Sequence, residues 1–80
     1  MEEYIPINCN FYDELEALAT MKKTCQIIFR HENGGISTIR GVIFDLYTRN
    51  KIEYLTLDSG LEIRLDKLME VDGKIPGNYC

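Results

Sequence analysis

The chain has few of the residues from which metal and redox sites are built. Its 80 residues include a single histidine, His31, and three cysteines. The cysteines, Cys9, Cys25 and Cys80, are far apart and form no C-x-x-C pair, whereas a structural zinc site needs about four clustered ligands. We therefore expect no metal site and no cofactor. An odd number of scattered thiols fits a reducing compartment, and Cys25, in an alternating apolar run, is expected in the core.

The common catalytic motifs are also missing. No G-x-S-x-G, P-loop or G-x-G-x-x-G segment occurs, and His31 flanks a predicted turn, where it is an ordinary surface residue rather than a general base. No apolar run approaches the about 20 residues of a membrane helix, and the acidic start of the chain is unlike a secretory signal. We expect a cytoplasmic protein that is not an enzyme. Its 80 residues suffice for one core only.

Basic residues are missing from the first quarter of the chain. Residues 1–21 hold five acidic residues and no Lys or Arg, whereas residues 22–80 hold nine basic and eight acidic residues, for a net charge of −4. The five acids are Glu2, Glu3, Asp13, Glu14 and Glu16. This segment is a candidate docking surface for a basic partner.

Residues 10–21 have the periodicity of one amphipathic helix. The apolar positions, spaced by four and three residues, share one face and are Phe11, Leu15 and Leu18. The opposite, solvent-facing side carries Tyr12, Asp13, Glu16 and Thr20. The acidic segment is therefore expected to present one charged helix face.

The ends of this helix also have suitable residues. Asn10 can cap it, because the Asn side chain accepts a free backbone N–H of the first turn. Asp13 and Glu14 are then expected in the first turn, where the helix dipole favours negative charge. Lys22 and Lys23 supply the positive charge that the C-terminus prefers.

The rest of the chain has the alternation and turn residues of short strands. We expect five strands, over 24–31, 36–48, 52–57, 61–65 and 67–71. Gly41 lets the long second strand bend, as small barrels require. The predicted fold is α+β and mainly β: an N-terminal helix followed by a five-stranded, strongly bent antiparallel barrel of the SH3-like or Sm-like kind. Residues 1–72 are expected to form this single domain and residues 73–80 a flexible C-terminal tail.

Direct binding of single-stranded RNA is an alternative that the sequence leaves open. A basic spot is formed by Arg49, Lys51, Arg64 and Lys67. Tyr47 and Tyr54 are available to stack on bases. Acidic residues are interleaved with these bases, however, and a pI near 4.8 gives little gain from counterion release.

Two ordered stretches form a more specific pattern. The first is Tyr4-Ile5-Pro6-Ile7-Asn8-Cys9, followed by Tyr12-Asp13 and Leu15-Glu16; the second runs from Arg49 through Glu53-Tyr54-Leu55 to Ile63-Arg64-Leu65-Asp66-Lys67. They resemble the PINC…YD.LE opening and the R…EYL…RLDK pattern of the Rho-binding antiterminator family, small bacterial proteins that inhibit the transcription termination factor Rho. Order and spacing agree over residues 4–70.

The resemblance implies an Sm-like barrel that binds the N-terminal RNA-binding region of Rho and obstructs RNA loading. The residues that match the family's contact motifs are Tyr12, Asp13, Glu16, Arg49, Asn50 and Lys51. Asp13 has the alternative role of stabilising the helix start, and 49–51 that of an ordinary hairpin turn. Asp66-Lys67 is expected to be a structural ion pair or turn. We expect a monomer that binds Rho and no nucleic acid; a barrel that recognises another basic protein is the remaining alternative.

Overall fold

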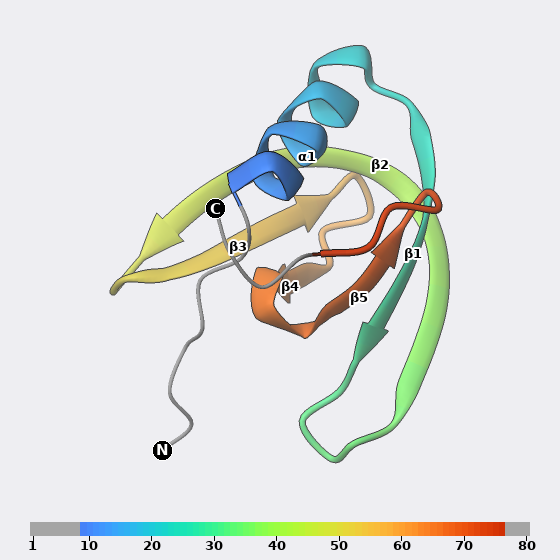
Figure 1. The fold of residues 1–80 in the computed structure, drawn as a ribbon, viewed down its shortest axis with the longest axis vertical. Helices are drawn as coiled ribbons and strands as arrows, with labels where there is room; N and C mark the ends of the chain where they lie inside the picture. The colour runs from blue at the N-terminus through green and yellow to red at the C-terminus, as the bar shows by residue number, and fades with distance from the viewer. Residues whose placement is uncertain (1–8, 77–80) are drawn as a thin grey trace.

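The computed structural model describes residues 9–76 of the chain; the Tyr4–Asn8 part of the first motif lies outside them. The element order is α1 (Cys9–Met21), β1 (Thr24–Arg30), β2 (Ile36–Arg49), β3 (Ile52–Leu57), β4 (Glu62–Arg64), the 3₁₀ helix η1 (Leu65–Lys67) and β5 (Leu68–Val71). The predicted helix and five strands are thus confirmed, and α1 lies across one side of the sheet (Figure 1). Within the described residues, no helix combines the length and apolar character needed to cross a membrane.

The N-terminal end of α1 differs from the prediction. The helix begins at Cys9, so Asn10 lies inside it and is not its cap. The first turn contains no acidic residue, because Asp13 and Glu14 fall one turn further along. The dipole argument for these two acids is therefore wrong, since the helix dipole acts mainly on charges in the terminal turn. This leaves Asp13 without the structural role that was its alternative.

The C-terminal end of α1 is closed by backbone hydrogen bonds rather than by charge. Lys22 has a φ of 54°, in the left-handed region that glycine usually occupies at this position. Its N–H donates to Ala19 O at 3.1 Å, and the Lys23 N–H donates to Leu18 O at 3.3 Å. This pair of bonds is a Schellman motif, which satisfies carbonyls that the helix itself leaves unpaired.

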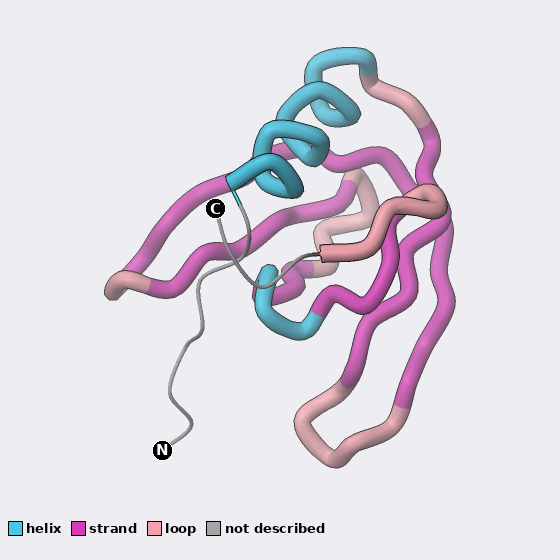
Figure 2. Tube along the Cα trace, viewed as in Figure 1, coloured by secondary structure: helices cyan, strands magenta, loops and turns pink. Residues whose placement is uncertain are grey.

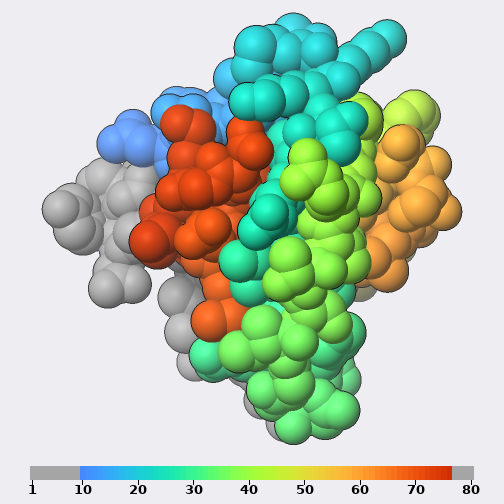
Figure 3. Space-filling model, turned by 90° about the vertical axis from the view of Figure 1, so that its right-hand side faces the viewer, coloured from blue at the N-terminus to red at the C-terminus, as the bar shows by residue number. Residues whose placement is uncertain are grey.

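The five strands form one antiparallel sheet in the order β4-β3-β2-β1-β5. The first half of β2 pairs with β1, as far as Thr24 opposite Val42, and its second half pairs with β3, starting with Ile43 opposite Leu57. The change of partner thus falls between Val42 and Ile43, next to Gly41, and β2 as a whole is strongly bent (Figure 1). In the perpendicular view, β1 lies between β2 and β5 (Figure 3). The predicted bend in this strand is confirmed.

The sheet is not shown to close on itself. Its edges are β4 and β5, which η1 connects (Figure 2), and no ladder joins them in residues 9–76. Closure into an Sm-like barrel therefore stays a prediction. The strand predicted over 61–65 is shorter than expected: β4 covers Glu62–Arg64, and Leu61 precedes it and is exposed.

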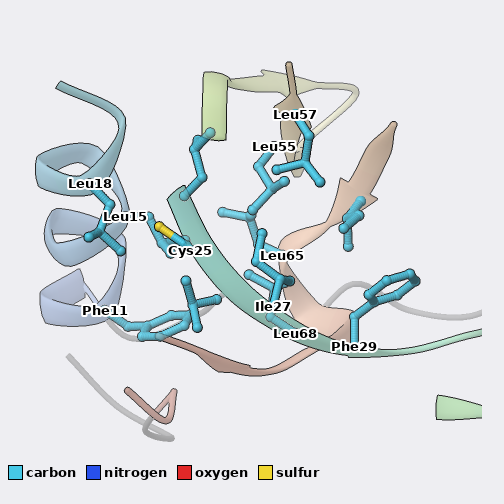
Figure 4. Packing of buried hydrophobic residues seen from close by; sticks show 13 residues of the cluster. Phe11, Leu15, Leu18, Cys25, Ile27, Phe29, Leu55, Leu57, Leu65 and Leu68 are labelled. Atoms are coloured by element: carbon cyan, nitrogen blue, oxygen red, sulfur yellow. The ribbon is translucent and has the colours of Figure 1, made fainter. Parts of the chain in front are cut away.

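One hydrophobic core fills the space between α1 and the sheet (Figure 4). Its fully buried members are Leu15, Cys25, Ile27, Ile43, Leu55, Leu65 and Val71. Leu15 and Leu18 of α1 point toward Cys25 of β1 in Figure 4, which shows how the helix is held on the sheet. Burial raises the pKa of the Cys25 thiol, so the thiol is protonated and unreactive at neutral pH. The prediction of a core cysteine is confirmed.

The chain after β5 makes a tight reversal. Asp72 and Gly73 have φ of 51° and 86°, and Val71 and Lys74 exchange backbone hydrogen bonds of 2.9 Å. Positive φ at both central residues is the type I′ arrangement of two-residue hairpins. Of the predicted tail over 73–80, residues 77–80 lie outside the described part of the chain.

Candidate partner-binding faces

Tyr12 is the centre of an acidic surface on α1. Its side chain is half-buried against the core. Burial raises the pKa of the Tyr12 hydroxyl, and the negative charges of Glu16, Glu53 and Asp45 raise that pKa further. A hydroxyl that senses three carboxylates lies in a region of negative potential.

Three elements bring these charges together. Glu16 follows Tyr12 by one helical turn, so the two side chains are neighbours on the helix surface. Asp45 comes from β2, and Glu53 comes from β3, opposite Thr48 in the ladder. We call Tyr12, Glu16, Asp45 and Glu53 the acidic face. It exists because α1 packs against β2, beside the second half of that strand.

A β-bulge changes the surface beside the acidic face. Ile43 pairs with Leu57 and Asp45 pairs with Thr56, so Phe44 is an extra residue on β2. A bulge turns its extra residue out of the ladder, and Phe44 is 76% exposed. Phe44 lines a shallow hollow of about 180 Å³. The other lining residues are Glu16, Ala19, Thr20, Asp45 and Leu46.

The other acids of α1 are placed differently. Asp13 lies on the exposed side of the helix, next to Tyr12 and within one turn of Glu16. Glu14 lies on the far flank, where its carboxylate is 3.4 Å from the Lys74 ammonium. Asp13 is therefore available to extend the acidic face, whereas Glu14 is turned away from it.

The predicted hairpin contacts are not on the acidic face. Arg49 pairs with Ile52, and the two residues between them, Asn50 and Lys51, have φ of 53° and 66°. These values are typical of a type I′ turn, in which both central residues have a left-handed backbone that most side chains disfavour. Since side chains alternate along a strand and Leu46 packs against the core, Arg49 projects from the opposite face. The structure thus brings Tyr12, Asp13 and Glu16 together on α1 but separates them from Arg49.

An aromatic and basic cluster covers that opposite face. The rings of Tyr47 and Tyr54 stack with centroids 5.4 Å apart. The Arg49 guanidinium lies 5.0 Å from the Tyr54 centroid and 5.8 Å from that of Tyr47. One of its nitrogens is 3.3 Å from Glu62 Oε1. We call Tyr47, Arg49 and Tyr54 the aromatic cluster. It contains both tyrosines that the RNA-binding alternative requires for stacking and one residue of its basic spot.

A second hollow, of about 360 Å³, lies next to Tyr54. Its charged and polar lining comes from Arg30, His31, Glu32, Glu62, Arg64 and Lys67. Arg64 is engaged within the fold, because it binds Asp66 through two contacts of 3.0 and 2.7 Å. Asp66 thus forms an ion pair with Arg64, and the predicted turn at Asp66-Lys67 is confirmed, since η1 contains both residues. His31 pairs with Ser37 across the 31–35 turn, in agreement with a turn-flanking role.

Sequence reasoning missed Phe44, Asp45 and Glu53 as neighbours of the helix acids. Phe44 and Asp45 are consecutive in β2, and alternation alone assigns them to opposite faces; the bulge is what exposes both. The one signal in the sequence was that Phe44 is followed directly by Asp45, because an unbroken strand would place one of these two side chains toward the core.

No family model matches the chain, and no curated protein matches it. The resemblance to the Rho-binding antiterminators therefore depends on the two ordered motifs and on the geometry of the residues within them.

Proposed function

We propose that this protein inhibits Rho-dependent transcription termination by binding the N-terminal RNA-binding region of Rho and obstructing RNA loading. The observation that carries the proposal is the acidic face, in which the negative charges of Glu16, Asp45 and Glu53 act together on Tyr12 of the first motif. The residues that match the family pattern on α1 thus lie on one surface. That surface has the charge that a competitor of RNA needs.

The physical basis is electrostatic imitation of a nucleic acid. A protein surface that loads RNA is basic, because contacts to phosphates provide most of the affinity. Carboxylates held on a helix present negative charges at defined positions to that same basic surface. Opposite potentials also accelerate encounter and make it dependent on salt. Binding by the acidic face therefore excludes RNA directly.

The rest of the molecule has a supporting role in this proposal. The bent sheet is a small Sm-like barrel that holds α1 in position, without catalysis or a cofactor. The protein acts as a cytoplasmic monomer, and the hairpin tip at Asn50-Lys51 makes a second contact beyond the acidic face.

The test is a titration of the cognate Rho hexamer with this protein at about 50 and 300 mM salt. We expect micromolar or tighter binding that weakens as salt rises and that Glu16→Lys reduces at least tenfold. Glu32→Lys is the matched control, because Glu32 is exposed in the 31–35 turn and changes the net charge equally. No binding to Rho, or equal effects of the two substitutions, would refute the proposal.

The hairpin contact is tested separately with Lys51→Gly. This change suits the positive φ of 66°, so it keeps the turn while removing the ammonium group. Weaker binding to Rho by a well-folded Lys51→Gly variant supports a contact at the tip. Unchanged binding shows that residues 49–51 serve the hairpin alone.

A second candidate, an Sm-like protein that binds single-stranded RNA, is favoured by the aromatic cluster. Stacked tyrosines with an arginine alongside suit sequence-tolerant binding of bases. It predicts that labelled oligouridine binds at about 50 mM salt, that affinity falls steeply as salt rises, and that Tyr54→Leu abolishes binding. No shift of the labelled RNA at that salt concentration would eliminate this candidate.

A further inference from the structure

The hollow beside Phe44 has a composition that the fold does not require. Phe44 lies outside the core, with 76% of its surface exposed. A bulge needs an extra residue at this point of β2 but no aromatic ring. Phe44 lines this hollow together with two acids, Glu16 of α1 and Asp45 of β2.

The charges of the hollow are uncompensated. Its six lining residues include two carboxylates and no basic side chain. Among the described residues, neither Glu16 nor Asp45 forms an ion pair; one Asp45 oxygen accepts the Leu46 N–H at 2.9 Å. A negative hollow with an aromatic wall has the features of a site for an organic cation.

We propose that this hollow is a subsite for one Arg or Lys side chain of the basic partner. The cationic group lies between the Glu16 and Asp45 carboxylates, and its methylene stem lies against Phe44 and Ala19. This inference rests on the proposed function and adds a specificity element to it. The acidic face attracts the partner as a whole, while the Phe44 hollow fixes the register of one cationic side chain.

The chemistry of the hollow discriminates against other occupants. A phosphate or carboxylate would be repelled by both acids. An apolar side chain would displace water from the two carboxylates without offering them new hydrogen bonds, and such desolvation of charged groups is unfavourable. An Arg or Lys side chain suits both the apolar residues and the carboxylates of the hollow, because it combines an apolar stem with a positively charged end.

The first experiment measures binding of Phe44 variants to Rho. Phe44→Ala is expected to weaken binding about tenfold, because it removes the apolar surface against which the methylene stem of the bound side chain lies. Phe44→Trp keeps an aromatic face and should bind within about threefold of the wild type. Ile36→Ala is the control, since Ile36 is also an exposed apolar residue of β2 but lies at the other end of the strand. Thermal melts check that each variant is folded. We expect the Phe44 variants to fold, because Phe44 is exposed and lies outside the core.

The outcomes separate this inference from the function it rests on. If Glu16→Lys loses Rho binding while Phe44→Ala keeps it, the subsite is refuted and the proposed function stands. If the wild type does not bind Rho, the subsite is tested by NMR with acetyl-Gly-Arg-Gly-amide and, as control, acetyl-Gly-Gln-Gly-amide. Chemical shift changes at residues 16, 44 and 45 with the Arg peptide alone support it. Equal changes with both peptides, or none with either, overturn it.

Discussion

Replacing Gly41 by alanine tests how the bend of β2 is made. A Cβ at position 41 would lie 3.2 Å from Asp58 Oδ1 and 3.5 Å from Leu57 Cδ1. The second distance is an ordinary contact, but the first is too short, so the Asp58 carboxylate has to move. That carboxylate accepts the Val42 N–H at 3.3 Å, and the movement strains this hydrogen bond. The absence of a side chain at Gly41 therefore favours the close approach of β2 to the turn after β3.

Two opposing terms set the size of the effect. Gly→Ala at a compatible backbone position stabilises a protein by about 0.4–1 kcal/mol through the unfolded state. Crowding Asp58 and weakening its hydrogen bond costs about 1–1.5 kcal/mol. We expect Gly41→Ala to lower the free energy of unfolding by about 0.5 kcal/mol. In an Asp58→Ala background the obstacle is absent, and the same change should raise it by about 0.4–1 kcal/mol.

The wild type, the two single variants and the double variant form a double-mutant cycle. Urea denaturation of these four proteins measures whether the effect of Gly41→Ala on the free energy of unfolding changes sign. With a slope of about 1 kcal/mol per molar urea, Gly41→Ala lowers the midpoint by about 0.5 M in the wild type and raises it by about 0.4–1 M in the Asp58→Ala background. The reasoning predicts a coupling energy of about 1 kcal/mol between positions 41 and 58. A coupling below about 0.3 kcal/mol, the level expected of independent sites, would refute it.

Three further predictions concern the C-terminal end of α1, the acidic face and the turn that follows β5. Lys22→Gly should raise the free energy of unfolding by about 0.5–1 kcal/mol in urea denaturation, because the φ of 54° strains any side chain; a loss of stability would show that the Lys22 side chain contributes contacts. Glu16→Gln should lower the pKa of Tyr12 toward its ordinary value in an NMR titration of the ring carbon, while burial and the two remaining carboxylates keep it raised; no change would place Glu16 away from the hydroxyl. The hydrogen bond from Lys23 at 2.8 Å holds the pKa of Asp72 below its ordinary value, so its contribution to stability is present above about pH 3.9 and is lost as pH falls through the lower folded pKa. Asp72→Asn should therefore make unfolding less dependent on pH between about pH 5 and 2, and an unchanged pH profile would contradict this pairing.

The confirmed predictions came from local patterns with strong physical causes. Apolar spacing over α1 fixed which helix face is buried, because Phe11, Leu15 and Leu18 have no other way to leave water together. The strands followed from alternation and from turn residues such as Asn33-Gly34, where Gly34 has a φ of 91°. The cap at Asn10 failed since N-cap residue types also occur inside helices, and the boundary was set one residue earlier.

The candidate site was only half visible in the sequence. Tyr12, Asp13 and Glu16 are close in the chain, and their common face follows from helical periodicity alone. Arg49 appeared to belong with them through its motif, but strand alternation places it on the other side of the hairpin with Tyr47 and Tyr54. A motif preserves order along the chain and carries no information about faces once a strand bends or bulges.

The sequence by itself determined the elements, the buried stripe of α1 and the excess of negative charge at the start of the chain. These depend on neighbours within a few residues, where periodicity and turn chemistry dominate. Only the tertiary structure decided that Asp45 and Glu53 join Glu16 around Tyr12, and that Phe44 is exposed beside them. Those positions depend on the change of partner in β2 between Val42 and Ile43 and on a one-residue bulge, because a shift of one residue moves a side chain to the opposite face of a sheet.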